Sequence, residues 1–139
     1  MKSSEIIFSP EEWISWADRH KAFLEGPVAV VGSMGAGKTT AVKFWLEAFH
    51  SESVATSPTF TLIHEYECPS GRIYHADFYR LKGEDEAEEL GINEIFDSGR
   101  PFWMEWPEKI PNLLPPESTV VHIEPQDSGS RLVTIYKTL

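Results

Sequence analysis

The sequence contains a single cysteine, Cys68, among its 139 residues. One thiol excludes an intramolecular disulfide and a cysteine-rich zinc site, and we expect Cys68 to be an incidental exposed residue of a turn. No apolar run approaches membrane-spanning length, and the first residues lack the apolar core of a signal peptide. We therefore expect a cytoplasmic protein with no membrane partner.

Basic residues are also few: 12 Lys and Arg stand against 22 Asp and Glu, which gives a formal net charge of −10. Direct binding to nucleic acid needs a basic face that displaces counterions, and the basic residues here are scattered. We expect no DNA partner, and contact with tRNA only indirectly through another protein. The hydrophobic fraction of 41%, with eight Phe and five Trp, is enough for the core of one domain over residues 1–139.

The chain is organised around a glycine-rich segment, Gly-Ser-Met-Gly-Ala-Gly-Lys-Thr-Thr, which satisfies the phosphate-loop pattern Gly-x-x-x-x-Gly-Lys-Ser/Thr. Residues 27–31 before it are typical of a buried strand and residues 40–49 after it of a helix, which is the context that this motif needs. Glycines let backbone N–H groups approach phosphate oxygens, and the helix dipole adds attraction. We expect Lys38 to contact the β- and γ-phosphates and the Thr39 hydroxyl to ligate Mg²⁺. The expected nucleotide-binding residues are Gly32, Ser33, Met34, Gly35, Ala36, Gly37, Lys38, Thr39 and Thr40.

Two carboxylates are candidates to complete the metal shell and to orient the attacking water. In a predicted strand, period-two alternation puts His75 and Asp77 on one face, at the edge where the phosphates would lie. Glu105 follows four apolar or aromatic residues, where a carboxylate is costly unless it faces a charge such as Mg²⁺. The alternatives are an Asp77–Arg80 ion pair and a strand-end hydrogen bond from Glu105 to the backbone. We expect Asp77 and Glu105 to be catalytic and, with Thr39, to serve the metal, and the sequence leaves open which carboxylate ligates directly.

Thr59 is the third catalytic candidate. It follows Ser57 and Pro58 on a predicted loop, where a hydroxyl is able to close on the γ-phosphate in the manner of a GTPase switch. The alternative is an ordinary loop threonine.

The remaining pattern predicts an α/β fold. Ser9, Pro10 and Glu12 indicate a capped helix start, and the Trp13 and Trp16 that follow at helical spacing are expected in the core. We expect a single-domain P-loop NTPase-like three-layer sandwich, in which helices flank a mixed, largely central β-sheet. The further expected elements are an edge strand at 6–8, a hairpin at 62–67 and 72–79, an acidic helix at 84–90, a strand at 102–106 and a terminal hairpin at 119–123 and 131–136.

Several motifs together indicate a family. In chain order they are Gly-x-x-Gly-Ala-Gly-Lys-Thr-Thr (32–40), Ser-Pro-Thr-Phe-Thr-Leu (57–62), His-x-Asp-x-Tyr-Arg-Leu (75–81), Glu-Leu-Gly (89–91) and Glu-Trp-Pro-Glu-Lys (105–109). In this combination the sequence resembles the TsaE (YjeE) family, small bacterial P-loop ATPases needed to make threonylcarbamoyladenosine in tRNA. The family usually has an acidic residue and a leucine where this chain has Ser33 and Met34, and these two positions lie between the essential glycines and lysine.

The resemblance implies a Mg²⁺-dependent ATPase that is weak alone, with ATP as ligand and ADP as product. In the family, the ATPase works with the TsaB–TsaD pair, of which TsaD transfers the threonylcarbamoyl group to a tRNA adenosine, and hydrolysis is implied to reset that pair between turnovers. By position, the resemblance assigns Asp77 and Glu105 to the metal and the hydrolytic water, Thr59 to the switch-like loop, and Trp106 to a place beside the site.

Other functions share the phosphate loop. A small-molecule or nucleoside kinase is the main alternative, but such kinases need a lid with several arginines, and the five arginines here are spread singly. A GTPase is a weaker alternative, because no Asn-Lys-x-Asp segment occurs. A binding module that holds ATP without useful turnover is the third alternative. A low rate of ATP hydrolysis would by itself agree with this alternative.

Overall fold

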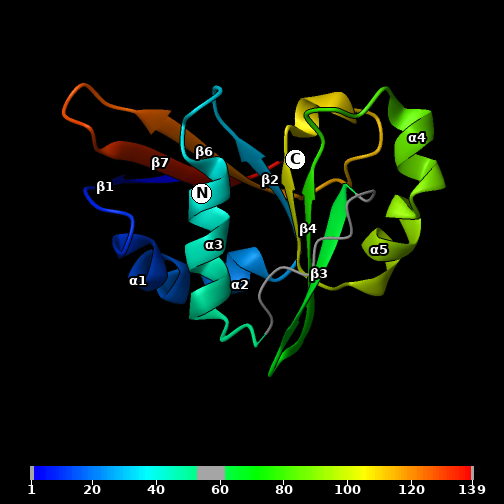
Figure 1. Cartoon of the computed structure of the whole chain (residues 1–139), viewed down its shortest axis with the longest axis horizontal. Helices are drawn as coiled ribbons and strands as arrows, with labels where there is room; N and C mark the ends of the chain where they lie inside the picture. Colours follow the sequence, from blue (N-terminus) through cyan, green and yellow to red (C-terminus); the bar gives the residue numbers. More distant parts are fainter. Residues whose placement is uncertain (1, 53–61, 139) are drawn as a thin grey trace.

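The computed structural model describes residues 2–52 and 62–138, so the prediction for Thr59 lies outside the described residues. Figure 1 shows the chain coloured from its N-terminus to its C-terminus. The elements in chain order are β1 (Lys2–Ile7), α1 (Glu12–Arg19), α2 (Lys21–Leu24), β2 (Pro27–Val31), α3 (Lys38–Ala48), β3 (Ile63–Cys68), β4 (Gly71–Asp77), α4 (Glu84–Glu89), α5 (Ile92–Ser98), β5 (Phe102–Glu105), the 3₁₀ turn η1 (Pro107–Lys109), β6 (Thr119–Pro125) and β7 (Arg131–Lys137).

The described strands form one mixed sheet in the order β1-β7-β6-β2-β5-β4-β3. β2 pairs in parallel with both β5 and β6, and β4 pairs in parallel with β5, whereas β1, β7 and β3 join antiparallel at the two sides. The carboxyl ends of β2, β4, β5 and β6 therefore meet at one edge of the sheet. Ligands of open α/β sheets bind at that edge, and the loop after β2 opens there.

Helices cover both faces of this sheet, which confirms the three-layer sandwich (Figure 1). On the face covered by α1, α2 and α3, a chain of indole rings runs from Trp16 through Trp45 to Trp103, with successive ring centroids 5.5 Å apart. Such aromatic pairs stabilise a core beyond the area that they bury. On the other face, α4 and α5 pack over Phe102 and Met104. No helix in the described part of the chain is both long enough and apolar enough to cross a membrane.

The first helix differs from its prediction at both ends. α1 begins at Glu12, and the Glu12 carboxylate accepts hydrogen bonds from the Phe8 N–H at 3.2 Å and the Ser9 hydroxyl at 3.3 Å. In the predicted capping box the Glu12 carboxylate would accept the Ser9 N–H. It accepts the Phe8 N–H instead, one residue earlier. The helix is also interrupted at His20, where φ is −117°, so that α2 is a separate turn.

The expectation that Cys68 is exposed was wrong. Cys68 is the last residue of β3 and is buried on the same side as Tyr66, against the tryptophan core. Burial raises the pKa of the Cys68 thiol. β3 pairs with β4 for one residue pair more than the sequence pattern indicates, because Cys68 pairs with Gly71. Cys68 therefore belongs to the strand and not to the turn.

Candidate functional site

The loop after β2 follows a path that only glycine allows at three positions. Gly35 and Gly37 have φ values of 79° and 98°, in the left-handed region that other residues rarely adopt. A Cβ at Gly32 would lie 2.7 Å from the Ile123 carbonyl oxygen. The glycines of the motif are therefore required by the fold of the loop itself.

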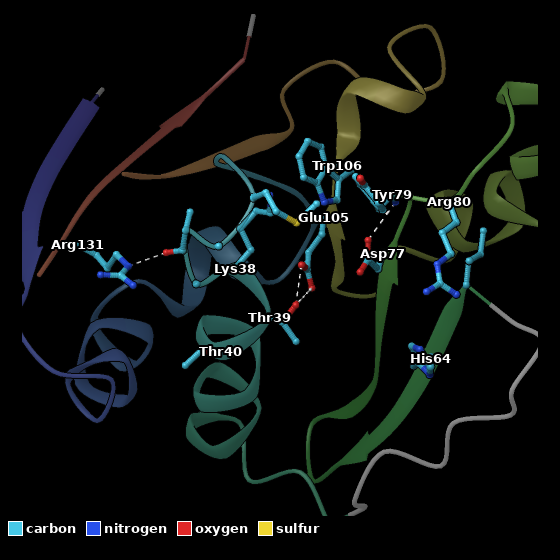
Figure 2. Close-up of a pocket in the computed structure, with 15 residues that line it drawn as sticks. Lys38, Thr39, Thr40, His64, Asp77, Tyr79, Arg80, Glu105, Trp106 and Arg131 are labelled. Atoms are coloured by element: carbon cyan, nitrogen blue, oxygen red, sulfur yellow. Dashed lines mark hydrogen bonds between the residues drawn. The ribbon is translucent and has the colours of Figure 1, made fainter. Parts of the chain in front are cut away.

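The loop leads directly into α3, whose first N–H groups have no helical partner. The first bond into the helix runs from the Ala41 N–H to the Gly37 carbonyl at 2.9 Å, so the N–H groups of residues 38–40 come before it. A helix N-terminus of this kind attracts anions. It lines a cavity of about 640 Å³, which also contains Asp77, Glu105 and Trp106 (Figure 2).

Lys38 lies buried over this loop, with only 6% of its surface exposed. Its Nζ donates to the carbonyl oxygen of Gly32 and, at 3.5 Å, to that of Ser33. The Trp106 ring lies over the same ammonium group, with its centroid 3.7 Å from Nζ. Burial lowers the pKa of Lys38, and nearby carboxylates, Glu105 foremost, partly offset that effect.

Glu105 ends β5 and is 2% exposed. The Thr39 hydroxyl donates to both of its carboxylate oxygens, at 2.9 and 3.1 Å, and His75 Nε2 lies 2.7 Å from Oε2 (Figure 2 marks the contacts with Thr39). These partners are side chains from α3 and β4, in place of the backbone groups that the alternative supposed. The structure thus joins the candidate metal ligand at the start of α3 to the candidate carboxylate of the sheet.

Asp77 ends β4 directly beside Glu105, its register partner on β5. The predicted alternation holds, because Ile73 packs on the tryptophan face whereas Tyr74 packs on the other. Asp77 Oδ1 accepts the Tyr79 N–H at 3.1 Å, and within the described residues no ion pair joins it to Arg80. Asp77 and Glu105 therefore lie together at the carboxyl edge of the sheet.

Arg131 belongs to the site although no pattern in the sequence points to it. It is the first residue of β7, and its Nε donates to the Ala36 carbonyl at 2.8 Å, while Nη1 donates to the Gly129 carbonyl at 2.9 Å. Its guanidinium group thus ties the glycine loop to the terminal hairpin. Nothing local in the sequence marks a lone arginine after a turn as such a contact.

Aromatic residues form the rim of the cavity. The Tyr79 and Trp106 rings lie 5.2 Å apart between centroids, and Tyr79 is 48% exposed. Trp106 has φ 58°, a strained conformation for a bulky residue that is found mainly at functional sites. This backbone conformation turns the chain after Glu105 and places the indole over Lys38.

A second histidine, His64, also lines the cavity. Among residues 2–52 and 62–138, nothing forms a hydrogen bond with its buried Nδ1, and its ring centroid lies 6.1 Å from that of His75. Burial lowers the pKa of His64, and the nearby His75 lowers it further, whereas Asp77 acts in the opposite direction without reversing the shift. His64 therefore favours the neutral form.

The metal prediction concerns Thr39, Asp77 and Glu105. In residues 2–52 and 62–138, no group of three or more His, Cys, Asp or Glu side chains is arranged to hold a metal ion by itself. Mg²⁺ usually keeps several waters and takes one or two carboxylates together with substrate phosphates. The site fits that pattern, and the metal assignment stays a prediction.

Known proteins resemble this chain over most of its length. The profile of the family described as "Threonylcarbamoyl adenosine biosynthesis protein TsaE" matches residues 8–133. The chain is 36% identical over 138 residues to the "tRNA threonylcarbamoyladenosine biosynthesis protein TsaE" of Rickettsia bellii, covering 97% of this chain and 95% of that one. It is 37% identical over 128 residues to the protein of the same name from Bacillus subtilis, covering 91% and 80%. The crystal structure of Bacillus subtilis YdiB is similar with a TM-score of 0.71 at 29% identity, covering 100% of this chain and 87% of that one.

Proposed function

Because the chain belongs to the TsaE family of threonylcarbamoyl adenosine biosynthesis proteins, we propose that it binds ATP with Mg²⁺ and hydrolyses it to ADP in support of threonylcarbamoyladenosine formation in tRNA. The observation that carries this proposal is the contact between the Thr39 hydroxyl and the buried Glu105 carboxylate. It joins the two kinds of group, a hydroxyl at the start of α3 and an acidic strand end, that a magnesium–triphosphate site combines.

The residues present fit a triphosphate and its metal ion. The loop offers N–H groups at the start of α3 and the Lys38 ammonium, and both kinds of donor match phosphate oxygens. The Thr39 hydroxyl donates a hydrogen bond to Glu105, which leaves the lone pairs of the Thr39 oxygen available to a cation. When bound, Mg²⁺ would neutralise charge on the β- and γ-phosphates, with Thr39 and Glu105 to hold it.

The two carboxylates take different roles in this proposal. Glu105 serves the metal shell, because it contacts Thr39, and His75 is a positioning residue that fixes the Glu105 carboxylate. Asp77 orients the attacking water and accepts its proton. Its Oδ1 is fixed by the Tyr79 N–H, and its side chain lines the same cavity.

We further propose that the TsaB–TsaD complex is the partner and that this chain contacts tRNA only indirectly, through that complex. The net charge of −10 supports this reading, since an acidic chain repels the phosphate backbone of RNA. The exposed rim residues Tyr79 and Met34 are the apolar groups at the mouth of the cavity that a docked protein would cover.

The test is steady-state ATP hydrolysis by the protein alone and mixed with purified TsaB–TsaD, with Lys38→Ala as the blank. Stimulation by the partner that vanishes in the blank is the expected result. Equal phosphate release by both variants would refute the loop as the site of hydrolysis. Transfer of phosphate to an added nucleoside or metabolite would favour a kinase instead.

A further inference from the structure

Cationic side chains hold three carbonyl oxygens of the glycine loop. Lys38 Nζ donates to the carbonyls of Gly32 and Ser33, and Arg131 Nε donates to the carbonyl of Ala36 at 2.8 Å (Figure 2 marks the bond from Arg131). Carbonyl oxygens carry partial negative charge and repel phosphate, whereas backbone N–H groups attract it. A loop that binds phosphate must therefore keep its carbonyls turned away from the anion.

The bond from Arg131 fixes the orientation of the peptide unit between Ala36 and Gly37. This peptide is trans, because the described part of the chain contains no cis peptide bond. In a planar trans peptide the C=O and the N–H point in opposite directions. With its carbonyl held by Arg131 of β7, the peptide turns the Gly37 N–H away from that strand. Asp77 and Glu105 lie on the far side, because β4 and β5 flank β2 opposite to β7 (Figure 2).

The Gly37 N–H is the first of four consecutive donors at the start of α3. Within residues 2–52 and 62–138, none of the N–H groups of residues 37–40 donates to a protein carbonyl, and the first such bond is that of Ala41. Gly37 is left-handed, with φ 98° and ψ 23°, and Lys38 begins the helix. Left- and right-handed residues in succession bring their N–H groups together into a concavity that binds anions. The peptide that Arg131 holds is thus the first member of this donor array.

Arg131 is suited to keep this hold while a phosphate is bound. Lys38 must leave the loop carbonyls before it can donate to a phosphate, but Arg131 has no such second task. Its Nη1 donates to the carbonyls of Gly129 at 2.9 Å and Ser130 at 3.3 Å, so the terminal turn fixes the guanidinium plane. A guanidinium group offers several N–H donors in one rigid plane, whereas an ammonium group is a compact point charge.

We propose that Arg131 is a positioning residue of the phosphate loop, which holds the peptide between Ala36 and Gly37 so that the Gly37 N–H donates to a bound phosphate. The inference rests on the proposed function, because it requires phosphate at the loop. It assigns Arg131 no contact with the nucleotide itself. Without the guanidinium group the peptide is free to rotate, since glycine at position 37 permits many backbone conformations.

The experiment measures the affinity for two ligands, inorganic tripolyphosphate and a non-hydrolysable ATP analogue, by displacement of a fluorescent nucleotide in the presence of Mg²⁺. Arg131→Ala is expected to weaken both ligands about tenfold, the loss typical of one hydrogen bond to a charged acceptor. Arg131→Lys should weaken both by a similar factor, because lysine keeps the charge but not the rigid plane of donors. Urea unfolding checks that each variant is folded, and Arg131→Lys carries the test if Arg131→Ala does not fold.

Arg100→Ala is the matched control. The Arg100 guanidinium also donates to two backbone carbonyls at a hairpin turn, those of Arg72 and Ser70, at 3.0 Å each. This turn lies at the opposite end of β4 from Asp77. The control therefore removes the same charge and the same kind of contact without touching the glycine loop, and both affinities should stay at the wild-type value.

Free guanidinium ion separates positioning from a general structural role. It is added to Arg131→Ala at concentrations far below those that unfold the protein, where it is expected to restore most of the affinity for tripolyphosphate. Urea at the same concentration has a similar shape but no charge, and it should restore little. A loss that guanidinium does not reverse would show that the substitution disturbs the hairpin as a whole, and would overturn the proposal.

The remaining outcomes separate this inference from the function on which it rests. A loss confined to the ATP analogue would overturn the inference, because Arg131 would then act away from the phosphates. Full affinity in Arg131→Lys would overturn it too, because charge alone would suffice. If Lys38→Ala weakens both ligands but Arg131→Ala weakens neither, only the inference fails. If Lys38→Ala changes neither ligand, the proposed phosphate site fails and the inference falls with it.

Discussion

Replacing Glu105 by glutamine removes one negative charge and keeps the shape of the side chain. The amide oxygen of Glu105→Gln still accepts the Thr39 hydroxyl, and His75 adjusts because a neutral imidazole can accept as well as donate. If Glu105 serves the metal shell, hydrolysis should fall about 10- to 100-fold, the loss typical of disturbing the groups that hold a catalytic metal. Nucleotide affinity should fall less than about tenfold, because the loop N–H groups and Lys38 remain.

The same substitution should not unfold the protein. Hydrogen bonds to a charged acceptor are worth about 1 kcal/mol more than those to a neutral one, so each contact of Glu105 weakens by about that amount. Against this, a carboxylate that is 2% exposed and lies next to Asp77 has lost most of its hydration, and the amide avoids that penalty. The two effects are similar in size. We expect the free energy of unfolding to stay within about 1 kcal/mol of wild type, or to rise.

The assay is single-turnover hydrolysis with TsaB–TsaD present, alongside urea unfolding. Glu108→Gln is the matched control, because it removes the same charge from an exposed residue of η1 that also acts on Lys38. Its hydrolysis should stay near wild type. An unchanged rate in Glu105→Gln would remove this carboxylate from the mechanism, and loss of folding would show that its charge is structural.

Two further predictions concern stability. Gly32→Ala should destabilise the fold by about 1–3 kcal/mol in urea unfolding, because the added Cβ would lie 2.7 Å from the Ile123 carbonyl oxygen. Gly26→Ala is the control and should not destabilise the fold, because the space around Gly26 is open. Equal effects of the two substitutions would refute the steric reason. Burial raises the pKa of Glu5, but hydrogen bonds from His20 and Arg19 outweigh it and the net shift is downward. The stabilisation that the Glu5 carboxylate contributes is present above the unfolded pKa of 4.5 and is lost as pH falls through the lower folded pKa. The difference in unfolding free energy between wild type and Glu5→Gln should therefore shrink on acidification. A difference that stays constant with pH would contradict this prediction.

The parts of the site that local patterns determine could be predicted from the sequence. The glycine loop is defined by spacing within a few residues, and its strand and helix are β2 and α3 with ends displaced by two residues at most. The shared face of His75 and Asp77 follows from strand alternation alone. The apolar or aromatic character of the residues before Glu105 correctly indicated a strand end that carries a carboxylate.

The parts that depend on distant segments could not be predicted. Arg131 contacts Ala36 across 95 positions of sequence, and only the sheet order brings β7 next to the loop. The bond between His75 and Glu105 likewise depends on the pairing of β4 with β5. The left-handed backbone of Trp106 has no sequence signal either, because a tryptophan before a proline gives no reason to expect φ above zero.

Because Glu105 contacts Thr39, the effect of Glu105→Gln on ATP affinity should have opposite signs with and without Mg²⁺, and this reversal tests the mechanism directly. Without a divalent cation, the wild-type carboxylate repels the phosphates and holds the Thr39 hydroxyl, so the neutral amide should bind ATP more tightly. With Mg²⁺, the carboxylate becomes favourable through the cation, and wild type should bind more tightly than the variant. A structural role for Glu105 would shift affinity in the same direction under both conditions. A reversal of order between EDTA and Mg²⁺ is therefore the result that a metal-shell carboxylate requires.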